Sequence, residues 1–240
     1  MLASVARMMT PARLVWLFDI DGTLLNTEGA AREAIAGAVH DCLGIDDDLR
    51  DISFAGRTDP LILADILAKH GRTFRNGEAD RFWTTAYARM DALLAPGRGH
   101  LLPGVTAMLD QVGATPDWVT ALLTGNTTDM ARIKLEHFGI ADRFAFGAFG
   151  EEAPDRDALA RVAVARATAG YGVPPARCVV VGDTENDIAC ARAAGAWVVA
   201  VATGIRDRAS LAAHHPDMLL DDLSNPAECL AWARSLTAGE

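Results

Sequence analysis

The 240-residue sequence lacks the features that would place a protein in a membrane or a secretory compartment. No apolar run approaches the roughly 20 residues that a helix needs to cross a bilayer. The first ten residues contain no hydrophobic stretch followed by a signal-peptide cleavage pattern. The four cysteines are too scattered for a disulfide framework, and none has a metal-binding spacing with another cysteine or a histidine. We therefore expect a cytoplasmic protein without a membrane partner.

Basic residues are also scarce. Lysine and arginine total 22 against 32 aspartates and glutamates, so the formal net charge is -10, and only Lys69 and Lys134 are lysines. Nucleic-acid binding needs a basic face that neutralises phosphates, so we expect no nucleic-acid partner. A small anionic substrate is compatible with this composition if a cation and a few arginines offset the field locally. The sequence does not distinguish a monomer from a homodimer.

Half of the residues are hydrophobic, which is enough apolar material for a substantial core. Short apolar runs without polar alternation are typical of strands buried on both faces, and segments with helical character separate these runs. Strands that alternate with helices predict an α/β fold with a parallel sheet covered on both faces. The expected strands are 14–18, 118–123, about 144–146, 178–181, 197–201 and 218–220, and the expected helices are 105–112, 128–138, 157–169, 186–194 and 207–213.

Residues from about 27 to 100 break this alternation, because three helical segments follow one another with no convincing strand between them. Thr58-Asp59-Pro60 is a good start for one of these helices, with a capping hydroxyl and a proline near the first turn. We predict an all-helical inserted domain at 27–100 and a core domain formed by 11–26 and 101–240. The expected helices of the insertion are 30–43, 61–70 and 78–94.

Polar side chains follow three of the predicted strands at the point where each strand ends. Asp19 and Asp21 follow the first strand, Thr124 follows the second, and Asp183 and Asp187 follow a later one. In open parallel sheets, ligands bind beyond the carboxyl ends of the strands. Four carboxylates at one edge would repel each other without a cation, so the pattern predicts a hard, oxygen-binding ion such as Mg²⁺.

These strand ends carry three ordered motifs: Asp19-Ile20-Asp21-Gly22-Thr23, Thr124-Gly125-Asn126, and Gly182-Asp183-Thr184-x-x-Asp187. Together with the helical insertion after the first motif, the sequence resembles phosphatases of the haloacid dehalogenase superfamily, most of all relatives of phosphoglycolate phosphatase. The resemblance covers nearly the whole chain. It implies a Rossmann-like parallel-sheet core with the first strand central, and an inserted type I helical cap.

The resemblance also implies roles for individual residues. Asp19 would be the nucleophile that becomes phosphorylated, Asp21 the general acid and base, and Thr124 a hydrogen-bond donor to the transferring phosphoryl group. Mg²⁺ would be held by Asp19, Asp183 and the backbone carbonyl of Asp21, with Asp187 orienting its water shell. The substrate would be a small phosphorylated metabolite. Expected substrate-binding residues are Thr23, Gly125, Asn126 and, in the cap, Arg57, for which a solvated surface arginine is an equally good interpretation.

The family's third motif is a basic residue, usually lysine, before the helix that precedes the last motif. Neither Lys69, in the insertion, nor Lys134, in the middle of a helix, stands where this motif belongs. Arg156 is the only cation of the segment 150–157, so we predict that it replaces the lysine and acts in catalysis. The alternative is a surface arginine paired with a neighbouring aspartate.

Two other activities of the same superfamily stay open. Haloacid dehalogenases lack the second aspartate and the Gly-Thr that follows it, whereas Asp21-Gly22-Thr23 is intact here, so a phosphatase is favoured. A phosphosugar mutase is the nearer alternative, because its cap shields the phosphorylated aspartate from water and its core motifs are the same. A binding protein on this scaffold would be expected to have lost a motif carboxylate, and all four are present.

Overall fold

The computed structural model describes residues 13–94 and 97–237, and within them it contains a sheet of six parallel strands. The strand order is β5-β4-β1-β6-β7-β8, so β1 lies inside the sheet with parallel neighbours on both sides. This arrangement confirms the expected α/β core. The strands are β1 (Leu14–Phe18), β4 (Trp118–Leu123), β5 (Gly147–Ala148), β6 (Cys178–Gly182), β7 (Trp197–Val201) and β8 (Met218–Leu220).

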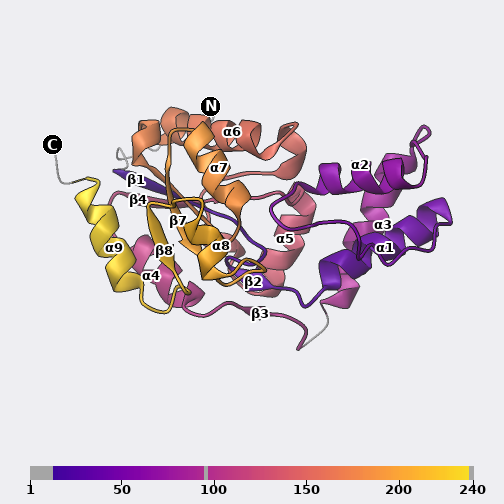
Figure 1. The fold of residues 1–240 in the computed structure, drawn as a ribbon, viewed down its shortest axis with the longest axis horizontal. Helices are drawn as coiled ribbons and strands as arrows, with labels where there is room; N and C mark the ends of the chain where they lie inside the picture. The colour runs from indigo at the N-terminus through magenta and orange to yellow at the C-terminus, as the bar shows by residue number, and fades with distance from the viewer. Residues whose placement is uncertain (1–12, 95–96, 238–240) are drawn as a thin grey trace, which may run out of the picture.

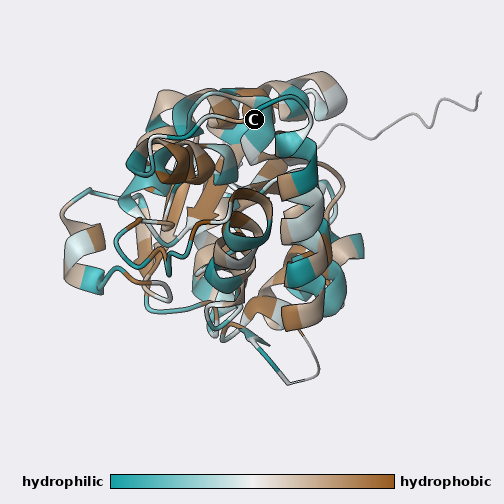
Figure 2. Cartoon of the chain, turned by 90° about the vertical axis from the view of Figure 1, so that its right-hand side faces the viewer, coloured by the Kyte–Doolittle hydropathy of each residue, from teal (hydrophilic) through white to brown (hydrophobic). Residues whose placement is uncertain are grey.

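Helices cover both faces of the sheet (Figure 1). Alternate side chains of β1 point to opposite faces: Leu14, Trp16 and Phe18 pack in one cluster, and Val15 and Leu17 pack in the other. The strands are brown in Figure 2, between helices that carry both brown and teal. The first cluster is covered by α4 (Val105–Ala114), α5 (Thr128–His137) and α9 (Pro226–Ser235), and the second by α6 (Arg156–Tyr171), α7 (Glu185–Ala193) and α8 (Arg208–Ala212).

The three remaining helices form a separate group at one end of the molecule (Figure 1). They are α1 (Ala30–Leu43), α2 (Asp59–Lys69) and α3 (Glu78–Leu93), and their apolar side chains share a third cluster. As expected, α2 begins at Thr58-Asp59-Pro60, where the Thr58 hydroxyl accepts a hydrogen bond from the Leu61 amide. Met130 and Ile133 of α5 also belong to this cluster, so the helical group is packed against a core helix.

A short antiparallel ladder joins the helical group to the sheet domain. β2 (Leu25–Asn26) pairs with β3 (His100–Leu101), so both connections between the two parts run side by side. We retain the division into 11–26, 27–100 and 101–240 as a proposal. Residues 11, 12, 95 and 96 lie outside the described residues.

Two details of the secondary structure differ from the expectation. A strand was expected at about 144–146, whereas β5 comprises only Gly147–Ala148 at the edge of the sheet. The sequence analysis also did not predict α9, which begins at Pro226. This helix contributes Cys229, Leu230 and Ala233 to the first core cluster. No helix in 13–94 or 97–237 is both long and apolar enough to span a membrane.

Candidate active site

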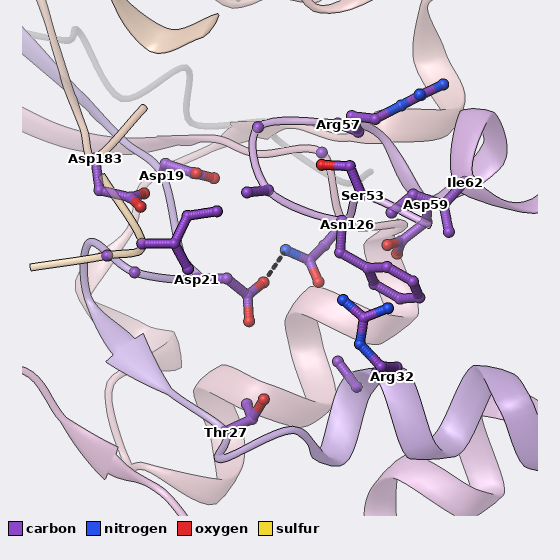
Figure 3. Close-up of a pocket in the computed structure, with 18 of the residues that line it drawn as sticks. Asp19, Asp21, Thr27, Arg32, Ser53, Arg57, Asp59, Ile62, Asn126 and Asp183 are labelled. Atoms are coloured by element: carbon purple, nitrogen blue, oxygen red, sulfur yellow. Dashed lines mark hydrogen bonds between the residues drawn. The ribbon is translucent and has the colours of Figure 1, made fainter. Parts of the chain in front are cut away.

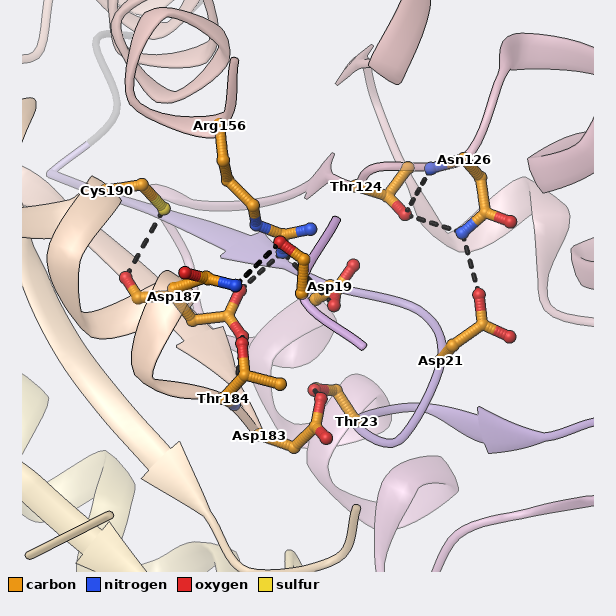
Figure 4. Close-up of polar contacts among 12 residues, drawn as sticks. Asp19, Asp21, Thr23, Thr124, Asn126, Arg156, Asp183, Thr184, Asp187 and Cys190 are labelled. Atoms are coloured by element: carbon orange, nitrogen blue, oxygen red, sulfur yellow. Dashed lines mark hydrogen bonds and ion pairs between the residues drawn. The ribbon is translucent and has the colours of Figure 1, made fainter. Parts of the chain in front are cut away.

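Three of the predicted carboxylates come together where β1 and β6 end. Asp19 directly follows β1, and its backbone amide donates to Val181 of β6 over 2.9 Å. Asp183 directly follows β6, and Asp187 lies in the first turn of α7. One carboxylate oxygen from each of these three buried residues lies within 4.8 Å of the other two. Figure 4 shows the three side chains in one group. The structure therefore gathers the carboxylates that the strand-end pattern predicted to be close.

The electrostatics of this cluster suit a bound cation. Burial raises the pKa of Asp19 to about 6, against the lowering effect of Arg156. Burial, together with the nearby charges of Asp187 and Asp19, raises the pKa of Asp183 well above its usual value. Buried carboxylates that disfavour their own charge are stabilised by a hard divalent ion, and carboxylate oxygens are the ligands that Mg²⁺ prefers. The carboxylates of Asp19 and Asp183 therefore fit a magnesium ion as direct ligands, and Asp187 is close enough to bond to its water shell.

The backbone around Asp183 leaves no room for side chains. Gly22 has a φ of 80°, and a Cβ atom there would lie 2.5 Å from Asp183 Oδ2. A Cβ atom at Gly204 would overlap the same oxygen. The hydroxyl of Thr23 donates to Asp183 Oδ1 over 3.3 Å, and within the described chain Thr23 does not line the cavity that the other site residues face. Its position suits holding the carboxylate rather than touching a substrate.

Arg156 lies beside Asp19 at the start of α6. Its side chain is 8% exposed, its Nη2 atom is 3.1 Å from Asp19 Oδ2, and the same atom donates to Asp187 Oδ1. The neighbouring Asp155 accepts a hydrogen bond from the Ala158 amide and so caps the helix. The arginine is thus placed in the site, next to the predicted nucleophile, and not on the surface beside Asp155 (Figure 4).

Lys134 is a site residue that the sequence interpretation missed. Its side chain is 2% exposed, and its ammonium group donates to Asp21 Oδ1 and Oδ2 over 2.8 and 2.6 Å. It also donates to Asn126 Oδ1 over 2.6 Å. Its position in the middle of a helix is not the place of the third motif, and no other motif of the sequence includes it. Side chains of a helix lean toward its N-terminus, however, so a long lysine on α5 reaches back to the sheet edge.

A signal for Lys134 was present in the sequence. The position falls among the buried residues Met130, Ala131, Ile133 and Leu135 of α5, at the spacing of a buried helix face. A lysine is almost never fully buried unless it is paired, so such a residue indicates a buried partner.

The second motif connects Asp21 to the β4 edge. Asn126 Nδ2 donates to Asp21 Oδ2 and to Thr124 Oγ1, both over 2.8 Å. Thr124 itself is fully buried. Gly125 is in close contact with the cap, which is the helical group of α1, α2 and α3 with its connecting loops. A Cβ atom at Gly125 would overlap the carbonyl oxygen of Arg57. The Gly125 carbonyl also accepts a hydrogen bond from the Asp59 amide over 2.7 Å, so the cap loop before α2 is docked on the second motif.

A cavity of about 590 Å³ lies between the helical group and the sheet edge (Figure 3). Asp19, Asp21, Asn126 and Asp183 line it from the core. Arg57, the predicted substrate-binding residue of the cap, is part of the cavity lining, and its side chain points away from Asp19 and forms an ion pair with Asp65 of α2 over 2.6 Å. The lining from the insertion includes Ala31, Arg32, Ile35, Arg50, Ile52, Ser53, Phe54 and Ile62.

The site and the fold belong to a known class of hydrolase. A family model described as haloacid dehalogenase-like hydrolase matches residues 15–195, which is more than half of the chain. The chain therefore belongs to the haloacid dehalogenase-like hydrolase family and is an enzyme of that family, as its three motifs predicted.

The chain is similar to several individual members of this family. A phosphoglycolate phosphatase of Cereibacter sphaeroides is 31% identical over 187 residues, which are 75% of this chain and 80% of that protein. Protein CbbY of Rhodobacter capsulatus is 28% identical over 196 residues, 76% of this chain and 82% of that protein. A β-phosphoglucomutase of Clostridium difficile shares the fold, with a TM-score of 0.71 and 19% identity over 93% of this chain and 97% of its own. The expected resemblance to phosphoglycolate phosphatases is thus confirmed.

Proposed function

We propose that the protein is a magnesium-dependent phosphatase that hydrolyses a small phosphorylated metabolite through a phosphorylated aspartate. The observation that carries this proposal is the position of buried Asp19, between Arg156 on one side and the Asp183 and Asp187 carboxylates on the other. Asp19, Arg156 and Asp183 also line the cavity, whereas Asp187 does not. The relatives named phosphoglycolate phosphatase support a phosphomonoester as the class of substrate.

In the first chemical step, a carboxylate oxygen of Asp19 attacks phosphorus, and the bond between phosphorus and the leaving oxygen breaks. Asp21 gives a proton to that leaving oxygen, so the product of this step is a neutral alcohol. In the second step, Asp21 takes a proton from water, the water oxygen attacks phosphorus, the bond between phosphorus and the Asp19 oxygen breaks, and inorganic phosphate leaves. The free enzyme is restored with Asp19 ionised and Asp21 protonated.

Other residues stabilise the charge of the phosphoryl group during both steps. Arg156 adds positive charge next to Asp19, and a guanidinium group matches phosphate oxygens in a forked geometry. The Thr124 hydroxyl and the backbone amide of Gly125 are the hydrogen-bond donors that we assign to the phosphoryl oxygens, because the Asn126 amide already donates to Thr124 Oγ1 over 3.3 Å. Bound Mg²⁺, held by Asp19, Asp183 and the Asp21 backbone carbonyl with Asp187 orienting its water shell, would supply further neutralisation of developing charge.

The test is a panel of small phosphomonoesters incubated with the purified protein and Mg²⁺. We expect release of inorganic phosphate, and no release by Asp19→Asn, whose amide is nearly isosteric but a poor nucleophile. A phosphosugar mutase is the second candidate, because an enzyme of that kind shares the fold. With a hexose phosphate in the panel, an isomeric sugar phosphate without free phosphate would identify a mutase. Phosphate release by Asp19→Asn at the wild-type rate would remove Asp19 from the mechanism.

A further inference from the structure

Arg32 places a positive charge on the cavity wall, away from the catalytic carboxylates. It is the third residue of α1, and in Figure 3 its guanidinium group points into the cavity on the side away from Asp19 and Asp183. Its Nη1 atom donates to the backbone carbonyls of Leu49 and Ile52, the latter over 3.0 Å. Its guanidinium carbon lies 4.2 Å from the centre of the Phe54 ring. All of these partners are uncharged.

The other cations that line the cavity in the described chain, and Lys69 of α2, are paired with acids. Arg57 is paired with Asp65, and Lys134 with Asp21. Lys69 contacts two aspartates, and the exposed Arg50 contacts Asp48 over 3.3 Å. Within residues 13–94 and 97–237, Arg32 has no acidic partner, although the chain carries 32 acidic residues against 22 basic ones. The charge of Arg32 is therefore not neutralised by an acid in direct contact, and it stays available to an anionic ligand.

The guanidinium group of Arg32 retains hydrogen-bonding capacity toward the cavity. A guanidinium group has five N–H donors, and the bonds to Leu49 and Ile52 both come from Nη1. No partner in the described chain is bonded to Nε or Nη2 of Arg32, and neither atom is among the buried atoms left without a hydrogen bond. These donors therefore remain accessible, on an arginine whose position is fixed by the carbonyls and the ring.

We propose that Arg32 binds a second anionic group of the substrate, so that the enzyme prefers phosphomonoesters whose leaving alcohol carries a carboxylate or another phosphate. This inference rests on the proposed phosphatase function and names the substrate class of the same site. The cavity of about 590 Å³ has room for both ends of such a molecule, with the transferred phosphoryl group at Asp19 and the second anion at Arg32. Arg32 is the specificity-determining residue in this arrangement.

The test compares kcat/KM for matched pairs that differ in the charge of the leaving group. One pair is 3-phosphoglycerate and glycerol 3-phosphate, and the other is fructose 1,6-bisphosphate and fructose 6-phosphate. For at least one pair, we expect the kcat/KM of the wild-type protein to be about 10–100-fold higher for the charged member. This ratio corresponds to the free energy of one hydrogen bond to a charged group. The pair that shows the preference identifies the anion as carboxylate or phosphate. In Arg32→Gln the ratio should fall toward one.

Control variants separate charge recognition from support of the loop at 49–54. Ile52→Val loosens the same loop but keeps the charge, the Phe54 ring and the backbone carbonyls that hold Arg32, so it should lower kcat/KM for both members of a pair and leave their ratio unchanged. Arg50→Gln removes an exposed cation of the same cavity and should also keep the ratio. Arg32→Lys retains the charge and should keep part of the preference for the charged member. If Arg32→Gln does not fold, the ratio of kcat/KM is measured in Arg32→Lys instead. A ratio near one in the wild-type protein, or a ratio that survives in Arg32→Gln, would overturn the proposal.

A failure of the proposed phosphatase function gives a different result. In that case no member of either pair is hydrolysed, and binding of the same compounds is measured by calorimetry on the wild-type protein and Arg32→Gln. Tighter binding of the charged member that is lost in Arg32→Gln supports the anion site without the phosphatase activity. Equal binding of both members to the wild-type protein contradicts the anion site.

Discussion

Lys134 holds the predicted acid and base in a defined position. Its buried ammonium group is bonded to both oxygens of Asp21 and to Asn126, and Asn126 in turn donates to Asp21. A buried charge is tolerated when it is paired and fully hydrogen-bonded, and a network of this kind fixes the geometry of its members. We therefore assign Lys134 as a positioning residue, which acts on the leaving group through Asp21.

Replacing Lys134 by methionine should impair proton transfer to the leaving group. We expect kcat/KM for an alkyl phosphate to fall by about 10²-fold, within the range for loss of general acid-base help. The loss should be much smaller for p-nitrophenyl phosphate, because its leaving group departs without a proton. The measurement is kcat/KM for both esters at saturating Mg²⁺.

Lys69→Met is the matched control, since Lys69 lies on α2, does not line the cavity, and is paired with Asp47 and Asp51. It should leave both constants near those of the wild-type protein. Equal losses for the alkyl and aryl esters in Lys134→Met would show that Lys134 has only a structural role.

Arg156 should contribute directly to stabilisation of the transition state. Arg156→Ala removes the charge next to Asp19, and we expect a loss of about 2–4 kcal/mol in kcat/KM, visible as a higher KM and a lower kcat. Thermal unfolding should also shift to a lower temperature, because Asp19 and Asp187 lose a buried cation. Arg161→Ala, an exposed position on the same helix, should change neither quantity.

Arg156→Lys tests whether charge alone is sufficient, and it is the variant to analyse if Arg156→Ala does not fold. It should recover part of kcat/KM, since an ammonium group supplies charge but not the forked geometry. Near-wild-type kinetics for Arg156→Ala would mean that the third motif lies elsewhere.

At the scale of elements, α5 connects the cap to the active site. Met130 and Ile133 of this helix pack in the cap cluster, whereas Ala131 and Leu135 pack in the core cluster. Its N-terminal region is bonded to the cap as well: Tyr87 of α3 donates to the Thr127 hydroxyl over 3.0 Å, and the Thr127 amide donates to Asp59 Oδ2 over 2.8 Å. The same helix carries Lys134. Displacement of the cap therefore acts on the helix that positions Asp21.

The contact at Asp59 makes the stability of the docked cap depend on pH. Burial raises the pKa of Asp59 from 3.8 to about 6, against the lowering effects of Lys134 and of the hydrogen bond from Thr127. A carboxyl group with a raised pKa in the folded state favours folding when protonated, so stability falls as pH rises from about 4 to about 6. Asp59→Asn removes this titration and keeps an oxygen that can accept from the Thr127 amide.

We expect the free energy of unfolding of Asp59→Asn to exceed that of the wild-type protein above pH 6. The rise in the pKa of Asp59 limits this difference in the free energy of unfolding to about 3 kcal/mol. Because Asp59 is partly exposed, the difference should be smaller than this limit. The difference should vanish near pH 4. Urea unfolding of both proteins from pH 4 to 8 gives this comparison, with the exposed Asp91→Asn as the control. Parallel pH curves for wild type and Asp59→Asn would contradict the assignment.

At the scale of the whole molecule, Mg²⁺ should act on stability as well as on activity. EDTA should abolish turnover and added Mg²⁺ should restore it, because the clustered carboxylates and the phosphate otherwise repel each other. Mg²⁺ at 100 times its Kd should also stabilise the folded protein by about 2.7 kcal/mol, which thermal unfolding detects without substrate. Asp183→Asn should lose this stabilisation. Full activity in excess chelator would contradict the magnesium-dependent proposal.

Sequence reasoning reached the parallel core and the gathered carboxylates because both depend on local patterns. Buried runs such as Leu14–Phe18 indicate the strands, and the carboxyl ends of parallel strands share one edge, so Asp19 and Asp183 had to lie close together. Lys134 and Arg32 could not be placed in this way. Their positions depend on the direction of a side chain from a helix and on how the cap docks, and both are tertiary properties.

The packing of Met130 and Ile133 against the cap has a calorimetric consequence. If the cap must move away from α5 to release product, these two side chains and their neighbours in the apolar cluster meet water in the open state. Exposure of apolar surface raises heat capacity. An opening step of this kind has an activation enthalpy that changes with temperature, so wherever product release limits turnover, a plot of ln kcat against reciprocal temperature is curved instead of straight.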